Sequence, residues 1–137
     1  GRVVDVEWAA LDPRLMGLGP VVSSVPLLQR NQLSIDDIDY WEINEAFAGQ
    51  LIACVKAMGD DQFCKRYFDL NEAFGTIDDS RLNIDGGAIG LGHPVGATGA
   101  RIALHLSHIL QRKEARYGVA TLCIGGGQGG AMLIERV

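Results

Sequence analysis

Segments with the two-residue period of a strand alternate along this chain with segments of helical period, and two strand segments follow each other at its end. The first strand is expected at Arg2–Ala10, where Val4, Val6 and Trp8 alternate with acidic residues. Alternating strands and helices are typical of an α/β protein, in which helices cover a sheet. The expected fold class is therefore α/β.

The remaining expected elements follow from apolar spacing and from turn residues. Further strands are expected at residues 36–43, 82–84, 117–124 and 131–137, and helices from Ser23 or Ser24, at 46–58 and at 96–110. Apolar side chains lie nearly all round the helix at 46–58, which predicts a central, buried helix. Residues 59–82 show little periodicity, so we expect one domain over residues 1–137 with a surface insertion at about 59–82.

Charge and cysteine content exclude several classes of protein. The net charge of −5 over 137 residues provides no basic surface for nucleic acid. No apolar run reaches the roughly 18–20 residues that a membrane span needs. Three cysteines without close spacing argue against a disulfide framework and against a zinc site, and they fit a reducing compartment. We therefore expect a cytoplasmic protein with free thiols, no nucleic-acid partner and no membrane span.

Residues able to do chemistry follow three of the expected strands. Asn44 follows the strand that ends at Ile43, His93 lies between the strand at 82–84 and the next helix, and Cys123 ends the strand at 117–124 just before Gly125. Open α/β sheets bind their ligands beyond the carboxyl ends of the strands. We expect these residues to gather along one edge of the sheet.

The residue types suit acyl transfer. Histidine titrates near neutrality, so His93 can take and return a proton. A thiol has a pKa of about 8.5, so Cys123 can act as a general acid or base after a modest shift. The glycines after Cys123 let a substrate approach backbone N–H groups that can hold an oxyanion. Asn44 can hold a water or donate to a second oxyanion.

Four segments carry a resemblance to a known family. They are Met-Gly-Leu-Gly-Pro at 16–20, Asn-Glu-Ala-Phe-Ala at 44–48, Gly-Gly-Ala-Ile-Gly-Leu-Gly-His-Pro-Val-Gly-Ala-Thr-Gly-Ala-Arg at 86–101, and Cys-Ile-Gly-Gly-Gly-Gln-Gly at 123–129. In this order they resemble the signatures of the C-terminal half of a thiolase, over nearly the whole chain. The resemblance implies a five-stranded mixed sheet with helices on both faces, packed against a similar N-terminal half.

The resemblance also implies roles for four residues. His93 resembles the histidine that activates the nucleophilic cysteine, and Cys123 resembles the second cysteine, which moves a proton at the substrate α-carbon or on the departing thiol. Asn44 resembles the asparagine that positions an oxyanion-hole water, and the N–H of Gly125 resembles a donor of the other oxyanion hole. Condensing enzymes that act on carrier-protein substrates typically have histidine in place of Asn44 and asparagine in place of His93.

The reaction implied by the resemblance is acyl transfer that makes or cleaves a 3-ketoacyl-CoA in fatty acid metabolism. Coenzyme A and acyl-CoA are the substrates, no metal or redox cofactor takes part, and the full enzyme is expected to be a homo-oligomer. Thiolases form their acyl-enzyme on a cysteine in the N-terminal half, on a glycine- and serine-rich turn. Neither Cys54 nor Cys64 has this setting, so we expect the isolated chain to be an inactive fragment.

Other interpretations remain open. A non-catalytic interaction domain is one, because the nucleophile is missing. Residues 125–130 match the G-x-G-x-x-G of dinucleotide-binding proteins, but a strand instead of a helix is expected after them. The second Asn-Glu-Ala-Phe, at 71–74, lacks a strand before it and is interpreted as coincidence. His105 and His108 share a helix without evident acidic partners, so a solvated position is favoured over a metal site.

Overall fold

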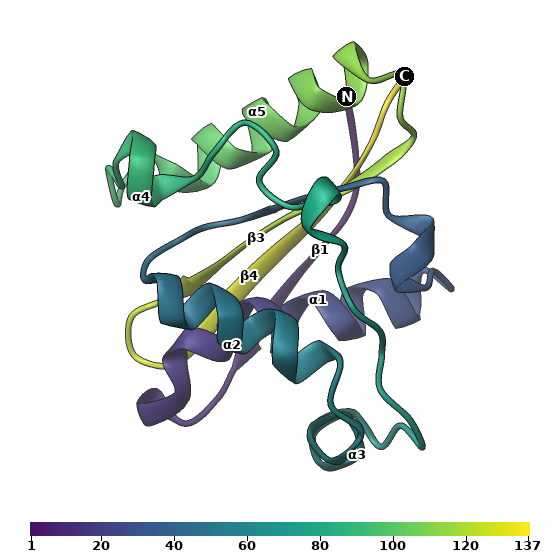
Figure 1. Cartoon of the computed structure of the whole chain (residues 1–137), viewed down its shortest axis with the longest axis vertical. Coiled ribbons are helices and arrows are strands. Elements are labelled where there is room, and N and C mark those ends of the chain that lie inside the picture. The colour runs from purple at the N-terminus through teal and green to yellow at the C-terminus, as the bar shows by residue number, and fades with distance from the viewer.

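The computed structural model describes all 137 residues, with a four-stranded mixed sheet at the centre of the molecule (Figure 1). The strands are β1 (Arg2–Ala10), β2 (Tyr40–Ile43), β3 (Tyr117–Ile124) and β4 (Gln128–Glu135). Their order is β1-β4-β3-β2. The strand β4 runs antiparallel to both its neighbours, whereas β2 and β3 are parallel. The α/β class is confirmed.

The fifth expected strand, at 82–84, is reduced to a single bridge between Leu82 and Trp41. The chain turns away at Asn83, whose φ of 45° lies in the left-handed region. The Asn83 side chain then bonds the backbone of Ile43, where Oδ1 accepts from the N–H and Nδ2 donates to the C=O, both at 2.9 Å. The sheet therefore has four strands instead of the expected five, because the Asn83 side-chain amide takes the place of backbone pairing.

Helices cover both faces of the sheet, as expected (Figure 1). They are α1 (Gly19–Arg30), α2 (Ala48–Met58), α3 (Asp61–Phe68), α4 (Ala88–Leu91) and α5 (Thr98–Arg112), with short 3-10 helices η1 (Pro13–Leu18), η2 (Ile35–Asp37) and η3 (Asp79–Arg81). Helix α1 packs on β1, β3 and β4 from one face, and α5 packs on β2, β3 and β4 from the other. Alternate strand residues accordingly enter two cores: Val119 faces the α1 side and Ala120 the α5 side.

Helix α1 begins earlier than expected, at Gly19 instead of Ser23 or Ser24. Pro20 occupies its first turn, where a missing N–H costs nothing, and Pro26 lies inside the helix. The early start is possible because Gly19 and Gly129 lie in contact, and a Cβ on either residue would overlap backbone atoms around the other. Gly19 is therefore a helix start packed on β4.

The helix at 46–58 is not the central helix that was expected. The side chains of Phe47 and Ile52 are 65% and 56% exposed, and Cys54 and Met58 are among the few fully buried positions of α2. This helix packs on α1 and η1 and so lies in an outer position (Figure 1). Its apolar circumference therefore does not reflect burial on all sides.

The segment 59–82 is more than a surface insertion. Helix α3 is amphipathic, and Cys64 on its inner face is fully buried. Ile77 also enters the core beside α1 and α2, and Phe63, Phe68 and Phe74 pack against that core. The polar composition concealed this packing because only a few apolar side chains, spaced along a short helix and a loop, point inwards.

Candidate active site

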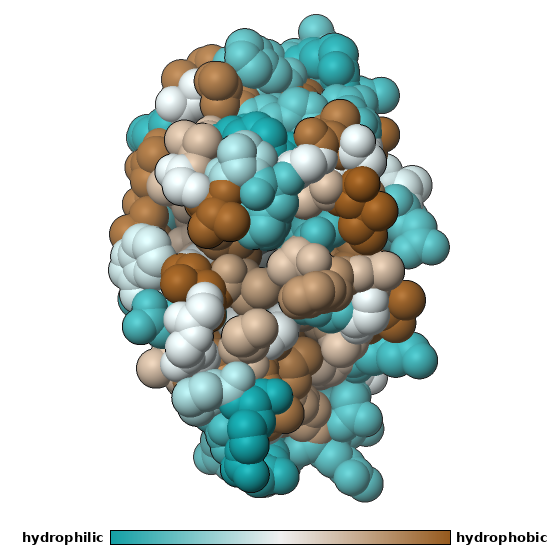
Figure 2. Space-filling model, turned by 90° about the vertical axis from the view of Figure 1, so that its left-hand side faces the viewer, coloured by the Kyte–Doolittle hydropathy of each residue, from teal (hydrophilic) through white to brown (hydrophobic).

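Segments distant in sequence meet beyond the carboxyl ends of β2 and β3, on the side of the molecule where the β3–β4 turn and α4 lie (Figure 1). Residues of hydrophobic or intermediate hydropathy cross the middle of this side, with hydrophilic residues above and below them (Figure 2). A cavity of about 230 Å³ opens here. Its lining residues are Met16, Ala46, His93, Val95, Leu122, Cys123, Ile124 and Gly125.

Asn44 joins this group through His93. It follows β2 directly, is 1% exposed, and its backbone N–H donates to the Thr121 carbonyl at 2.9 Å. Its side-chain Nδ2 lies 3.4 Å from Nε2 of His93. The side-chain Oδ1 is buried and has no hydrogen-bond partner in the protein. The structure thus brings all four expected site residues to one edge of the sheet.

The tautomer of His93 follows from its neighbours. The Thr98 hydroxyl donates to the Pro94 carbonyl at 3.1 Å, and its oxygen lies 2.7 Å from His93 Nδ1. Because the hydroxyl has one proton, it accepts from a protonated Nδ1. The lone pair then lies on Nε2, which faces the Asn44 amide and the cavity. His93 is consequently arranged to accept a proton at Nε2.

Glu45 fixes the distance between the strand of Asn44 and the loop of His93. One carboxylate oxygen accepts from Asn83 Nδ2 at 2.9 Å, and the other accepts from the N–H of Ile89 in the first turn of α4 at 3.2 Å. A Cβ at residue 87 would overlap the Glu45 carboxyl group, so Gly87 is required for this contact. The carboxylate therefore anchors the glycine-rich loop to the end of β2.

Cys123 lies half-buried at the end of β3, beside the first residue of α1. A Cβ at Gly19 would lie 3.1 Å from the Cys123 Cα and 2.5 Å from the Gln128 carbonyl oxygen, so only glycine allows this approach. Burial raises the pKa of the Cys123 thiol. The group is therefore a neutral thiol near pH 7, in the state from which it can donate a proton.

The turn after Cys123 presents free backbone donors. Gly126 and Gly127 have φ of 86° and 85°, which favours glycine, and the Gly125 N–H makes no backbone hydrogen bond. Gly125 lines the same cavity as His93 and Cys123. The turn joins two antiparallel strands and no helix follows it, so the dinucleotide-binding interpretation of residues 125–130 is wrong.

The other two cysteines lie outside the cavity. Cys54 is fully buried on α2, and burial raises its pKa to about 12. Cys64 is fully buried on α3, where its thiol contacts the Ala57 and Met58 carbonyls at 3.6 and 3.5 Å. Both thiols are packed as core side chains, and all three cysteines are free.

Sequence reasoning missed Thr98 as part of the site. It is fully buried at the start of α5, and it holds His93 from five residues away in sequence. A hydroxyl residue in the first turn of a helix suggests a cap, and here its side chain orients a histidine instead. The only available signal was its place within the glycine-rich segment.

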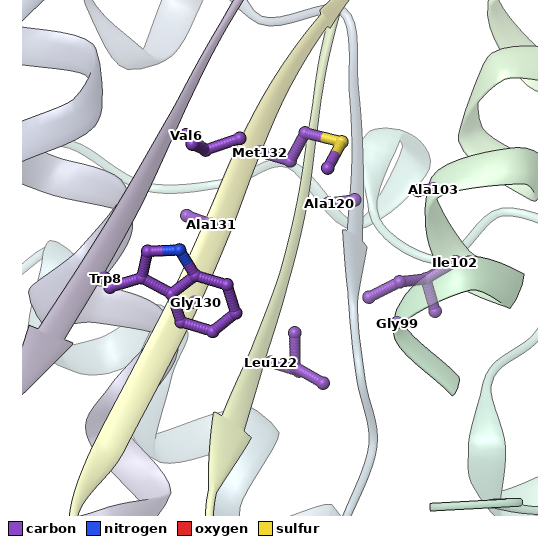
Figure 3. Close-up of a pocket in the computed structure, with 10 residues that line it drawn as sticks. All are labelled: Val6, Trp8, Gly99, Ile102, Ala103, Ala120, Leu122, Gly130, Ala131 and Met132. Carbon is purple, nitrogen blue, oxygen red and sulfur yellow. The ribbon is translucent and has the colours of Figure 1, made fainter. Parts of the chain in front are cut away.

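A separate apolar cavity of about 240 Å³ lies on the α5 face of the sheet (Figure 3). Val6 and Trp8 of β1, Leu122 of β3 and Met132 of β4 line it together with Ile102 of α5. The Trp8 ring packs over Gly130, and its side chain is 69% exposed. Leu122 also lines the cavity of His93, so the two cavities adjoin along β3.

No group of three or more His, Cys, Asp or Glu side chains is arranged to hold a metal ion. None of the five α-helices combines the length and the apolar character that crossing a bilayer demands.

Comparisons with known proteins agree on one family. The family model described as "Thiolase, C-terminal domain" matches residues 1–136. The 3-ketoacyl-CoA thiolase of Salmonella typhimurium is 43% identical over 136 residues, and the 3-oxoadipyl-CoA/3-oxo-5,6-dehydrosuberyl-CoA thiolase of Escherichia coli is 45% identical over 137. Each comparison covers 99% of this chain, which spans 32% and 30% of the length of those relatives.

Solved structures give the same result. The crystal structure of human mitochondrial 3-ketoacyl-CoA thiolase has a TM-score of 0.81 and 41% identity, covering 99% of this chain and 30% of that chain. A second crystal structure of the human enzyme, in complex with CoA, has the same similarity. The acetyl-CoA acetyltransferase of Bacillus anthracis has a TM-score of 0.81 and 39% identity, with the same coverage.

Proposed function

The chain belongs to the thiolase family, and from this premise we propose that it is the C-terminal catalytic part of an acyl-CoA C-acyltransferase. The enzyme makes or cleaves a 3-ketoacyl-CoA by acyl transfer to or from coenzyme A. One observation carries the proposal: His93, Cys123 and Gly125 line a single cavity, with the Asn44 amide 3.4 Å from His93 Nε2.

In the acyl-forming step, His93 Nε2 accepts the proton of an attacking thiol, and the thiolate adds to the substrate carbonyl. The Thr98 hydroxyl keeps the proton on Nδ1, so that Nε2 presents its lone pair. Neither Cys54 nor Cys64 can be the attacking thiol, because both are fully buried. The nucleophile therefore comes from outside this chain, and the acyl group resides there.

Cys123 transfers the proton to or from the α-carbon of the substrate. In cleavage, the bond between the α- and β-carbons breaks, and the Cys123 thiol donates its proton to the departing α-carbon. The Cys123 thiolate then takes the proton of coenzyme A, whose sulfur accepts the acyl group and releases the nucleophile as a thiolate, and this thiolate regains its proton from His93. In synthesis, the Cys123 thiolate removes the proton from the α-carbon, and the bond between the α- and β-carbons forms. A pKa raised by burial keeps Cys123 protonated near pH 7, which suits the donor role.

Two sites stabilise the oxygen atoms on which negative charge develops. The free N–H of Gly125 donates to one, in a cavity where displaced water strengthens the interaction. At the other, a water held by the Asn44 side-chain N–H donates to the oxygen, together with a protonated His93. Making and breaking these bonds changes no oxidation state, so the proposed reaction needs coenzyme A and acyl-CoA only.

An N-terminal thiolase half is the proposed partner, and the apolar cavity around Trp8 is its proposed contact (Figure 3). This surface lies on the α5 face and adjoins the cavity of His93 along Leu122, so a partner seated there reaches the site with its own thiol. The alternating residues Val6 and Trp8 of β1 are exposed at 43% and 69% without it. Burying them is favourable.

The proposal includes the cellular location, the metabolic role and the oligomeric state of the full enzyme. We place the enzyme in the cytoplasm and in fatty acid metabolism, and we expect the full enzyme to be a homo-oligomer. Three free thiols and the bacterial relatives that carry the name 3-ketoacyl-CoA thiolase support this setting.

A chimeric enzyme tests the proposed function. This chain replaces the 136 aligned residues of the Salmonella typhimurium relative, and cleavage of acetoacetyl-CoA by coenzyme A is measured. The chimera is expected to be active, and His93→Ala is expected to lower kcat by about 10²–10⁴. The isolated chain is expected to form no acetyl adduct with acetyl-CoA. A folded but inactive chimera would contradict the proposal and favour a non-catalytic interaction domain.

A further inference from the structure

A buried carboxylate, a histidine and a second carboxylate form a chain of hydrogen bonds beside the site. Glu42 of β2 is 1% exposed, and its Oε1 lies 3.1 Å from Nδ1 of His105 on α5. The other ring nitrogen of His105, Nε2, lies 3.1 Å from Oδ2 of Asp85. Arg112 donates to the same Asp85 oxygen at 2.6 Å. The expectation that His105 lacks acidic partners is therefore wrong.

These contacts require two protons. Oxygen atoms face both ring nitrogens of His105, so each of the two contacts is a hydrogen bond only if it contains a proton. The proton toward Asp85 lies on Nε2, and the other is shared between Glu42 and Nδ1. With these two protons, Glu42, His105 and Asp85 together have a charge of −1, which the Arg112 cation balances. A neutral cluster is favoured because an unbalanced charge beside a core is costly.

Each partner of His105 belongs to a segment that carries a site residue. Glu42 precedes Asn44 by two residues on the same face of β2. Asp85 lies in the loop that leads from Asn83 to His93, and His105 is on α5, whose first residue, Thr98, holds His93. The cluster therefore joins the three segments at one point.

The surrounding charges are few. Arg101 and Arg112 approach from α5, and burial raises the pKa of Glu42 while the nearby His105 and Arg101 oppose that change. His108, one turn further along α5, is exposed and makes no hydrogen bond to Glu42 or Asp85. Arg112 and His105 together lower the pKa of Asp85. Glu42 and Asp85 are the two ionisable side chains that hydrogen-bond to His105.

We propose that His105 is a positioning residue, which joins Glu42 to Asp85 and thereby keeps Asn44 and His93 in contact. The catalytic roles of Asn44 and His93 rest on the proposed function, whereas the contacts rest on the structure alone. Loss of His105 leaves the buried Glu42 carboxylate unpaired, and it leaves Arg112 as the one remaining hydrogen-bond link from α5 to Asp85. The loop of Asp85 is then held less tightly between β2 and α5, and the distance of the His93 ring from Asn44 varies more.

The test is nuclear magnetic resonance of the 137-residue chain with ¹⁵N-labelled histidine. In the native chain, His105 should carry a slowly exchanging proton on Nε2. In His105→Ala, the Nδ1 proton of His93 should exchange with water about tenfold faster, and both His93 ring nitrogens should change chemical shift. The matched control, His108→Ala, removes a histidine from the same helix and should change neither signal.

Unchanged His93 signals in His105→Ala would overturn the proposal, even if the melting temperature fell. If His105→Ala does not fold, Glu42→Gln decides. It keeps the side-chain volume and an oxygen acceptor but removes the carboxylate, and it should shift the His93 signals in the same direction. No change in Glu42→Gln would overturn the proposal equally. The experiment measures no turnover, so an inactive enzyme would contradict the proposed function and leave this result intact.

Discussion

The Thr98 hydroxyl determines which nitrogen of His93 is free to act. It is fully buried, donates to the Pro94 carbonyl and accepts from His93 Nδ1 at 2.7 Å. Without this partner, the one N–H proton of a neutral imidazole can lie on either ring nitrogen, and the ring rotates more freely. The position of the lone pair on Nε2 and its direction therefore depend on a fully buried neighbour.

Thr98→Val tests this dependence, because valine keeps the shape and removes the hydroxyl. In the chimera, kcat should fall by about 10–100-fold while KM changes little, since orientation of the base matters more than substrate binding. Thr98→Ser restores the hydroxyl and should recover most of the activity. A valine variant with wild-type kcat would show that the hydroxyl does not orient His93.

Reactivity of the three cysteines should follow their burial. Cys123 is half-buried with a raised pKa, and Cys54 has a pKa of about 12. At neutral pH iodoacetamide should modify Cys123 alone, more slowly than a free thiol, because a raised pKa leaves less thiolate at any given pH. The rate should keep rising with pH beyond the point where a free thiol levels off, at about pH 8.5. Peptide mass mapping across pH identifies the modified residue, and earlier modification of Cys54 would contradict this order.

At the residue scale, the sequence predicted where Asn44, His93 and Cys123 lie better than it predicted the side chains around them. Asn44, His93 and Cys123 each lie in a recognisable motif at a strand end, and the structure places them together. The partnership of His105 with Glu42 and Asp85 spans 63 and 20 residues. No local pattern marks it, because it exists only after α5 has packed on β2.

The loop between η3 and α5 depends on one glycine. Gly87 leaves the space in which the Glu45 carboxylate reaches the N–H of Ile89, at 3.2 Å. Asn83 holds the other oxygen of the same carboxylate. The glycine-rich segment is therefore an ordered connection that sets the position of His93, and its small residues serve packing as well as turns.

Gly87→Ala should displace Glu45 and lower the free energy of unfolding by about 1–3 kcal/mol, the cost of a lost buried hydrogen bond and of steric strain. Urea unfolding monitored by circular dichroism measures the change. The matched control is Gly90→Ala in α4, where a Cβ would meet no atom within 4 Å. Equal stability of the two variants would show that Glu45 does not need the space at residue 87.

Elements with a clear period were predicted well, and those defined by packing were not. The strands β1 and β3 have the expected bounds, because alternation and flanking turns mark them. The outer position of α2 was not predicted, because apolar side chains all round a helix do not indicate which other elements pack on it. Helix α3 was missed because its eight residues present a single deeply buried side chain, Cys64, in a polar context.

The whole molecule leaves one of its two sheet faces partly covered. Helix α5 covers β2 and β3, whereas β1 and β4 leave Val6 and Trp8 exposed along the cavity of Figure 3. A protein that exposes this surface should associate through it.

Trp8→Lys should therefore reduce self-association of the isolated chain without unfolding it, because the tryptophan is already 69% exposed. Sedimentation across a concentration series measures the association of the native chain and of the variant. Ile52→Lys, a change of similar kind on α2 where the side chain is 56% exposed, should leave association unchanged. A native chain that stays monomeric at high concentration would contradict the role of this face.

The central claim is that two protons are handled separately, one by His93 and one by Cys123. The most direct measurement is the half-reactions of the chimera with Cys123→Ser. Acylation, followed by intact mass after mixing with acetyl-CoA, should fall much less than cleavage, because His93 activates the attacking thiol and the departing coenzyme A thiolate needs a proton less than a departing carbon does. Cleavage of acetoacetyl-CoA should fall by about 10²–10⁴, because serine is a far weaker proton donor at carbon. Near-normal cleavage, or a loss of acylation as large as the loss of cleavage, would contradict the account.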